Sequence, residues 1–124
     1  MSSINGQLAC DIKDMFVNSK EVEMSLRFRT HAEISVFIRN NKLQKFTYDE
    51  FDLQPFGSEE DDEFDGMPKE VYTRLCNLIY ASIKDFQVLI EYGFINIQWS
   101  FDAIQNEIEN ISVRTRKEIH CQHR

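Results

Sequence analysis

The stretch Ile34-Ser-Val-Phe-Ile-Arg-Asn-Asn-Lys-Leu-Gln-Lys-Phe-Thr-Tyr48 decides the fold of this chain. Over residues 34–39 apolar and polar side chains alternate, which is typical of a strand with one buried face. Asn40-Asn41 favours a two-residue hairpin turn, because asparagine tolerates a positive φ. A further strand is predicted over 43–48, and the slip of its apolar phase near Gln44-Lys45 indicates a β-bulge.

Upstream of this hairpin the sequence predicts a helix and one more strand. Leu8, Ile12 and Phe16 recur at helical spacing, which predicts an amphipathic helix over residues 5–17. Residues 22–29 alternate four times between apolar and polar side chains, which predicts a strand. Together with the hairpin, this strand would complete a three-stranded antiparallel meander.

Downstream of the hairpin the sequence predicts a long helix followed by a strand. Proline suits the first position of a helix, and an apolar stripe in helical register follows Pro68. We therefore expect a helix over 68–91 with Gly93 just past its end. Residues 86–92 fit either the last part of this helix or a strand. Alternating apolar and polar residues over 95–101 predict the fourth strand.

Asp102 and Gln105 have the spacing of a capping box, which predicts a last helix over residues 103–119. The resulting order, α-β-β-β-α-β-α, predicts an α+β fold in which an antiparallel β-meander of about four strands is packed by two to three helices. A length of 124 residues suits a single domain over residues 1–124. Within it we expect an acidic loop at about 49–67 and a frayed C-terminal tail at about 119–124.

The composition excludes several classes of protein. Hydrophobic residues make up 42% of the chain, with ten Phe, which is enough for an independent core and argues against disorder. No apolar run approaches the roughly 20 residues of a membrane-spanning helix, and the N-terminus lacks the pattern of a secretory signal. Three scattered cysteines indicate free thiols in a reducing compartment. We expect a cytoplasmic protein that does not bind membranes.

The local concentration of acidic residues is the strongest clue to function. The formal net charge is −7, and nine acidic side chains with no basic one lie between Thr47 and Pro68. Without those nine, 12 acidic side chains oppose 14 basic ones. A local field of this kind steers a basic partner, and an acidic chain lacks the basic footprint that direct nucleic-acid binding needs.

Phe56 and Phe64 lie among these acids, where they could serve as apolar anchors ringed by charge. A hydrated loop whose two phenylalanines pack onto the domain is the alternative. The predicted partner-binding residues are Asp49, Glu50, Asp52, Phe56, Glu59, Glu60, Asp61, Asp62, Glu63, Phe64 and Asp65.

No catalytic residue, metal or cofactor is expected. The acids of residues 61–65 lack the alternating spacing of an EF-hand. His120, Cys121 and His123 supply three zinc-type ligands where a closed site needs four, so a frayed tail is favoured. His31 is the only histidine in the predicted folded region, and no nucleophile motif accompanies it.

Two segments flanking the acidic stretch carry a resemblance to a known group. These are the helix Pro68-Lys-Glu-Val-Tyr-Thr-Arg-Leu-Cys-Asn-Leu-Ile-Tyr80 and the strand Phe94-Ile-Asn-Ile-Gln-Trp-Ser-Phe-Asp102. With the preceding helix and strands, this plan resembles small immunity proteins that neutralise bacterial polymorphic or contact-dependent toxins, some of which have a Tyr-x-x-Leu helix and a Trp-x-Phe-like strand. The resemblance covers roughly residues 5–102, and the basic segment from 103 onward departs from it. It implies a bacterial toxin inhibitor without identifying the toxin.

The sequence therefore favours a non-enzymatic cytoplasmic protein that occludes the active site of a basic, nuclease-type toxin, with carboxylates of residues 49–65 in place of nucleic-acid phosphates. One alternative is a phage or mobile-element protein that inhibits a host DNA- or RNA-handling enzyme as an acidic mimic. Another is a small α+β enzyme or ligand-binding domain. Both a monomer and a homodimer, formed through strand edges or the last helix, are compatible with the sequence.

Overall fold

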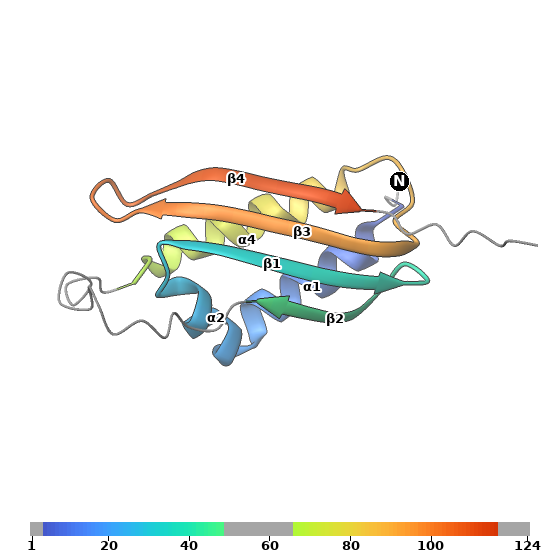
Figure 1. Cartoon of the computed structure of the whole chain (residues 1–124), viewed down its shortest axis with the longest axis horizontal. Helices are drawn as coiled ribbons and strands as arrows, with labels where there is room; N and C mark the ends of the chain where they lie inside the picture. The colour runs from blue at the N-terminus through green and yellow to red at the C-terminus, as the bar shows by residue number, and fades with distance from the viewer. Residues whose placement is uncertain (1–3, 49–65, 117–124) are drawn as a thin grey trace, which may run out of the picture.

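The structure, a computed structural model, describes residues 4–48 and 66–116, which form one four-stranded antiparallel sheet with helices on one face (Figure 1). Its elements are α1 (Gly6–Asn18), α2 (Lys20–Arg27), β1 (His31–Arg39), β2 (Lys42–Tyr48), α4 (Lys69–Lys84), β3 (Tyr92–Asp102) and β4 (Glu107–Arg116). The predicted α+β class is confirmed, although the order is α-α-β-β-α-β-β instead of α-β-β-β-α-β-α.

The sheet consists of two hairpins that lie side by side in the order β2-β1-β3-β4. β1 pairs antiparallel with β2 on one side and with β3 on the other. The predicted three-stranded meander is wrong, because the segment expected as its first strand is helical. The free side of β1 is therefore open to β3, whose residues Ile95 and Ile97 pair with Val36 and Ile34.

The β1–β2 hairpin agrees with the prediction in detail. Asn40 and Asn41 have φ angles of 56° and 60°, which is the backbone that a tight two-residue hairpin turn requires. Phe37 pairs with Lys45 and Ile38 pairs with Leu43, so the residue between these two partners on β2 is the extra residue of a bulge.

Residues 22–29, predicted as a strand, instead form most of α2 and its C-terminal end. Ser19 caps this helix, because its hydroxyl accepts the backbone N–H of Val22 at 3.3 Å. Val22 and Leu26 are buried, whereas Met24 between them is 53% exposed. When every second residue is apolar, every fourth residue is apolar as well, and residues four apart lie on the same face of a helix. The pattern therefore fits a helix as well as a strand, and the Ser19 cap favours the helix.

The segment predicted as a last helix over 103–119 forms β4 where the structure describes it. Oδ1 of Asp102 accepts the N–H groups of Ile104 at 2.9 Å and Gln105 at 3.2 Å, but these groups belong to the turn between β3 and β4, so the predicted capping box of a helix is wrong. Asn106 then takes a φ of 55°, which turns the chain back along β3. Ile104, the expected start of an apolar stripe, is 94% exposed. Pairing with β3 and a high content of β-branched residues explain the strand.

The helix predicted over 68–91 is shorter than expected. It begins directly after Pro68, as predicted, but ends at Lys84. Residues 86–91 form neither helix nor strand, and β3 begins at Tyr92. Gly93 therefore does not end the helix but lies within β3, with a φ of 123°. The strand predicted over 95–101 is confirmed as part of β3.

The hydrophobic core fills the space between the helices and the inner face of the sheet. Inward-facing residues of the two central strands are buried, including Ile34, Val36, Ile97 and Trp99. Trp99 is 2% exposed, so the large indole ring belongs to the core. None of the described helices is long and apolar enough to span a membrane.

Asn5 is the only fully buried polar residue in the described part of the chain, and its side chain makes four hydrogen bonds. Its amide nitrogen donates to the carbonyl groups of Phe86 (3.2 Å) and Val88 (3.0 Å). Its amide oxygen accepts the N–H of Ile90 (3.1 Å) and the side-chain amide of Asn41 (3.1 Å). Asn5 thus joins the start of α1, the β1–β2 turn and the irregular segment before β3.

Replacing Asn5 with Ala should lower the free energy of unfolding by about 3 kcal/mol, because buried donors and acceptors lose their partners. Urea denaturation measures this change. Gln7→Ala is the matched control, since it removes one exposed hydrogen bond from Gln7 to Asp11, at 3.0 Å. We expect the control to change stability by less than about 0.5 kcal/mol. Equal losses in the two variants would contradict a central role for Asn5.

Candidate functional site

The predicted site residues all lie outside the described part of the chain. They are Asp49, Glu50, Asp52, Phe56, Glu59, Glu60, Asp61, Asp62, Glu63, Phe64 and Asp65. The structure does define the two points where residues 49–65 join the domain. The upstream junction is Tyr48, the last residue of β2, and the downstream junction is Gly66, which precedes Met67.

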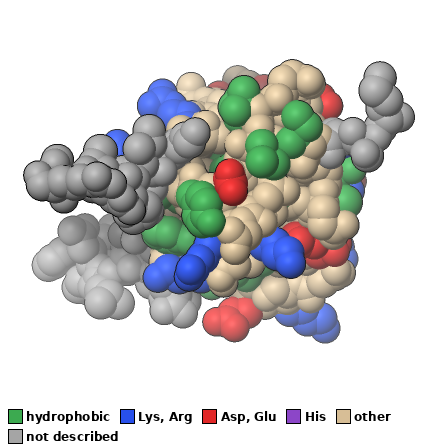
Figure 2. All heavy atoms as spheres, turned by 90° about the vertical axis from the view of Figure 1, so that its right-hand side faces the viewer, with side chains coloured by type: hydrophobic (Ala, Val, Ile, Leu, Met, Phe, Trp, Pro, Cys, Tyr) green, Lys and Arg blue, Asp and Glu red, His purple; other side chains and the backbone are tan. Residues whose placement is uncertain are grey.

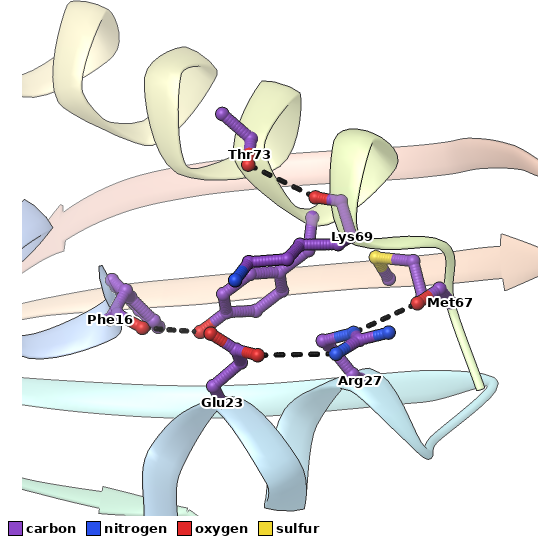
Figure 3. A network of polar contacts seen from close by, with 7 residues as sticks. Phe16, Glu23, Arg27, Met67, Lys69 and Thr73 are labelled. Atoms are coloured by element: carbon purple, nitrogen blue, oxygen red, sulfur yellow. Dashed lines mark hydrogen bonds and ion pairs between the residues drawn. The ribbon is translucent and has the colours of Figure 1, made fainter. Parts of the chain in front are cut away.

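The downstream junction is tied to the end of α2 by two hydrogen bonds in opposite directions. The N–H of Met67 donates to the carbonyl of Arg27 at 2.7 Å, and Nε of Arg27 donates to the carbonyl of Met67 at 2.9 Å (Figure 3). Arg27 also forms an ion pair with Glu23 one helical turn earlier, at 3.1 Å. The Met67 side chain is fully buried. The chain is therefore held firmly at Met67, close to where the second described range begins.

Gly66 is required at this junction for two independent reasons. Its φ is +91°, a conformation that residues with a side chain rarely adopt. In addition, a Cβ atom at this position would lie 2.7 Å from the ring of Phe28, which follows α2. The ring of Phe28 consequently packs directly against the glycine backbone.

The upstream junction carries a second arginine. The guanidinium of Arg29 lies 5.9 Å from the ring centre of Tyr48, and that ring stacks on Phe46 at 5.7 Å. Nε of Arg29 donates to the carbonyl of Ser25 at 3.0 Å, and Nη2 is buried without a hydrogen-bond partner among the described residues. Arg27 and Arg29 thus place positive charge beside both ends of the acidic segment. The residue pattern does not predict this role, because a strand over residues 22–29 would place both arginines on its polar, solvent-facing side.

Two described side chains have strongly perturbed pKa values, and both lie on the buried face of α4. Burial raises the pKa of Tyr72, whose hydroxyl donates to the carbonyl of Phe16 at 2.8 Å (Figure 3). Burial also raises the pKa of Cys76 to about 11, and the neighbouring Tyr72 hydroxyl offsets only part of this effect. Both groups are therefore held in their protonated forms, which suits packing and does not suit a nucleophile or a base.

The described residues contain no group of three side chains that could hold a metal ion. His31 is exposed at the start of β1 and pairs with Ser100 in the sheet. The tail residues His120, Cys121 and His123 lie outside the described part of the chain.

The face of the sheet that carries no helices combines an aromatic pair with basic side chains near the β1–β2 turn. Phe37 and Phe94, on the two central strands, have ring centres 5.5 Å apart. Lys45 lies 5.0 Å from the centre of the Phe37 ring, and Arg116 lies 5.5 Å from that of Phe94. Such cation–π contacts hold the cations in place over the rings. This end of the face suits an anionic ligand.

The end of the molecule next to the β1–β2 turn also exposes hydrophobic side chains, several of which are visible as a group in Figure 2. Val88 is 62% exposed and Leu89 is 47% exposed, although both belong to a segment without regular structure. Asn5 and Asn41 fix the backbone beneath them, because Asn41 donates to the carbonyl of Ile90 at 2.6 Å. Exposed apolar groups on a backbone held in this way suit contact with a protein.

Comparisons with protein-family models, with curated proteins and with solved structures found no match to this chain.

Gly66→Ala should lower the free energy of unfolding by about 2 kcal/mol or more, through the positive φ and the clash with Phe28. Thermal and urea denaturation measure the loss. Gly6→Ala is the control, because Gly6 is the first residue of α1 and does not have a positive φ. The double variant Gly66→Ala, Phe28→Ala should recover part of the loss. A neutral Gly66→Ala would contradict the close packing at this junction.

Cys76 should make stability depend on pH in the alkaline range. Folding raises the pKa of its thiol from 9.0 to about 11, so folding favours the protonated form. The resulting stability is fully present below pH 9.0 and is lost as the pH rises to about 11. Its full size is roughly 2 to 3 kcal/mol.

The measurement is the free energy of unfolding between pH 7 and pH 11 for the wild type and Cys76→Ala. The wild type should lose more stability across this range than Cys76→Ala, while Cys10→Ala should behave as the wild type because Cys10 is exposed. Parallel curves for all three proteins would show that Cys76 ionises equally easily in the folded and unfolded states.

Proposed function

We propose that this chain is a non-enzymatic cytoplasmic binding protein that neutralises a basic partner, as the immunity protein of a nuclease-type toxin. The carboxylates of residues 49–65 would occupy the partner's phosphate-binding cleft, with Phe56 or Phe64 as an apolar anchor. The observation that carries the proposal is the run of nine acidic residues without a basic one between Thr47 and Pro68.

The distribution of charge supports this proposal. The described residues contain 12 basic and 11 acidic side chains, so the folded part is nearly neutral. The formal charge of −7 therefore arises from the segment and not from the domain that bears it. A localised field of this kind accelerates encounter with a partner of opposite charge, and a partner built to bind nucleic acid presents such a surface.

The junctions add to the support. The Arg27–Met67 hydrogen bonds and the Gly66–Phe28 contact fix the downstream end of the segment on α2. Tyr48 fixes the upstream end at the edge of the sheet, next to Arg29. Ends that are held at fixed points limit the volume available to the 17 residues between them, which raises the local density of negative charge.

The chemistry of the described residues favours binding over catalysis. The two strongly shifted pKa values belong to buried groups held in the protonated form. An open hollow of about 260 Å³ between α4 and the start of β4 is lined by four aliphatic side chains together with Arg74, Asn106 and Glu107. Neither Tyr72 nor Cys76 lines this hollow, and the described residues contain no group of side chains that could hold a metal ion, so the hollow adds no support for catalysis.

The test is charge reversal of the segment with a matched control. Immobilised wild-type protein is exposed to bacterial extract at low salt, and bound proteins are identified by mass spectrometry. We expect the captured partner to be a basic enzyme that acts on nucleic acids. A stoichiometric amount of the present protein should inhibit that enzyme. Changing Glu59, Glu60, Asp61, Asp62 and Glu63 to Lys should slow association with it by about 100-fold at low salt and remove the salt dependence.

The control variant changes five exposed acids of the folded domain to Lys, namely Asp14, Glu21, Glu70, Asp85 and Glu91. It alters the net charge by the same amount and should retain most of the association rate. Equal effects of the two variants would mean that only net charge matters and would overturn docking through the segment.

The captured partner also separates the remaining alternatives. A host polymerase or repair enzyme in place of a toxin would favour the acidic mimic of a phage or mobile element. The aromatic and basic end of the sheet is a second candidate site, because its cations and rings are already in contact. Binding would be assigned to this end if the captured partner were an acidic protein or a nucleic acid that Lys45→Ala and Arg116→Ala no longer bind.

A further inference from the structure

On the side away from β3, the ten-residue strand β4 pairs with no other strand of the described residues. In the order β2-β1-β3-β4, only β2 and β4 lie at the edges of the sheet. An open edge is a template for pairing with another strand unless its side chains prevent it. The charges along the two edges differ, and this difference decides what each edge can pair with.

The direction of the backbone groups on β4 follows from β3. Phe101 of β3 donates its N–H to the carbonyl of Thr30, beside β1. Backbone groups alternate in direction along a strand, so even-numbered residues of β3 direct theirs at β4. The β4 residues that pair with these even-numbered residues therefore direct their N–H and C=O groups toward β3. Ile108 and Thr115, which pair with Phe101 and Ile95, therefore turn theirs toward the open edge.

Four charged side chains lie on the uncovered face of β4, with acids at one end and bases at the other. Glu107 and Glu109 pair with Asp102 and Ser100, and Arg114 and Arg116 pair with Asn96 and Phe94. No ion pair joins any of these four to another residue in the described ranges. Glu107 even lies directly opposite the carboxylate of Asp102, which is an unfavourable pairing within the sheet.

We propose that β4 pairs antiparallel with β4 of a second copy of this chain, which joins two sheets into one of eight strands. A two-fold axis between Ile111 and Ser112 places Glu107 opposite Arg116 of the second copy and Glu109 opposite Arg114 of the second copy. The symmetry repeats both pairs, so all eight charges find an opposite charge. The acidic residues that oppose like or neutral groups within one sheet thereby gain basic partners.

The direction of the backbone groups fits the same register. Ile108 lies opposite Thr115 of the second copy, and both turn their N–H and C=O groups to the edge, so the two residues can exchange hydrogen bonds. The charged residues then fall on the non-hydrogen-bonded pairs, where opposite side chains approach most closely. A register shifted by one residue would lose both the backbone hydrogen bonds and the pairs of opposite charges.

The irregular part of β4 falls at the centre of the proposed interface. Asn110 has a φ of 54°, and the register with β3 shifts between Gln98 and Ser100. The bulge thus lies beside the two-fold axis, and the regular parts on either side of it carry the charged pairs.

Exposed apolar side chains flank the same edge. Leu78 on α4 is 50% exposed and Ile111 on β4 is 38% exposed. Leu78 and Ile108 also line the open hollow of about 260 Å³ between α4 and β4. A sheet that continues past β4 brings a second α4 alongside the first, which would remove these side chains from water.

The opposite edge does not have this complementarity. The exposed side chains of β2 include Lys42 and Lys45, and no acidic residue lies in this strand. Antiparallel pairing of β2 with itself about its midpoint would place Lys45 against Lys45 of the other copy. Edge lysines and a bulge are common devices against such pairing.

The test uses two variants with like charges along the whole edge. Glu107→Lys, Glu109→Lys makes it entirely basic, and Arg114→Glu, Arg116→Glu makes it entirely acidic. Sedimentation velocity at about 100 μM should show a wild-type dimer and a monomer for each variant, with the dissociation constant raised about 100-fold or more. An equimolar mixture of the two variants should again give a dimer.

Lys42→Glu, Lys45→Glu is the control, because it changes charge on the other edge and should leave the dimer intact. Circular dichroism confirms folding of every variant. Thr115→Pro gives a second readout that does not depend on charge. Its lost N–H faces the open edge and not β3, so the variant should fold as a monomer, whereas Thr115→Ala should remain a dimer.

A monomeric wild type would overturn the proposal, as would dimers that survive both charge variants. A mixture of the two variants that stays monomeric would overturn the register. Reversal of Glu59 to Glu63 should not affect the dimer, so failure of this proposal and failure of the proposed function can be distinguished.

Discussion

The four hydrogen bonds of the Asn5 side chain join three parts of the chain, which are the start of α1, the β1–β2 turn and residues 86–90. One amide group satisfies backbone groups of residues 86–90 that a longer α4 would have satisfied internally. It also binds Asn41 in the β1–β2 turn, whose own backbone N–H donates to Glu91 at 3.1 Å. The end of α4, the start of β3 and the position of the first hairpin all depend on this buried contact.

The network also explains an exposed surface. Residues 86–91 are neither helix nor strand, yet they present Val88 and Leu89 to solvent on a backbone with defined partners. A segment without regular structure normally avoids such side chains at its surface or varies in conformation. Here the asparagines supply the order that secondary structure supplies elsewhere, so the apolar groups keep a fixed arrangement.

Local patterns were sufficient for about half of the elements. The β1–β2 hairpin, its bulge, α1, the start of α4 and β3 each follow from a short stretch with one possible period or one turn signal. Residues 22–29 and 104–111 carry apolar spacings that fit both a helix and a strand. The Ser19 cap favours the helix in residues 22–29, and pairing with β3 favours the strand in the second segment. The end of α4 was beyond prediction because it depends on Asn5, more than 80 positions away.

Some of the functional features can likewise be found from the sequence alone, whereas others need the structure. The acidic segment is a matter of composition and can be found without coordinates. The arginines at its junctions, the required glycine at Gly66 and the Phe37–Phe94 pair become visible only when distant segments are brought together. The self-complementary charges of β4 are present in the sequence, but they carry no meaning until the segment is known to be an edge strand.

The pairing of β1 with β3 has a consequence for how the protein folds. The paired residues lie between 53 positions apart, for Arg39 and Tyr92, and 69 positions apart, for His31 and Ser100. Each hairpin can form locally and quickly, but the sheet closes only after the chain has brought the two hairpins together across α4 and the acidic segment. Such a high contact order slows folding, and each half exposes its unpaired central strand until closure. We therefore expect the pairing of β1 with β3 to be the slow step of folding, with the length of the acidic segment setting part of its entropic cost.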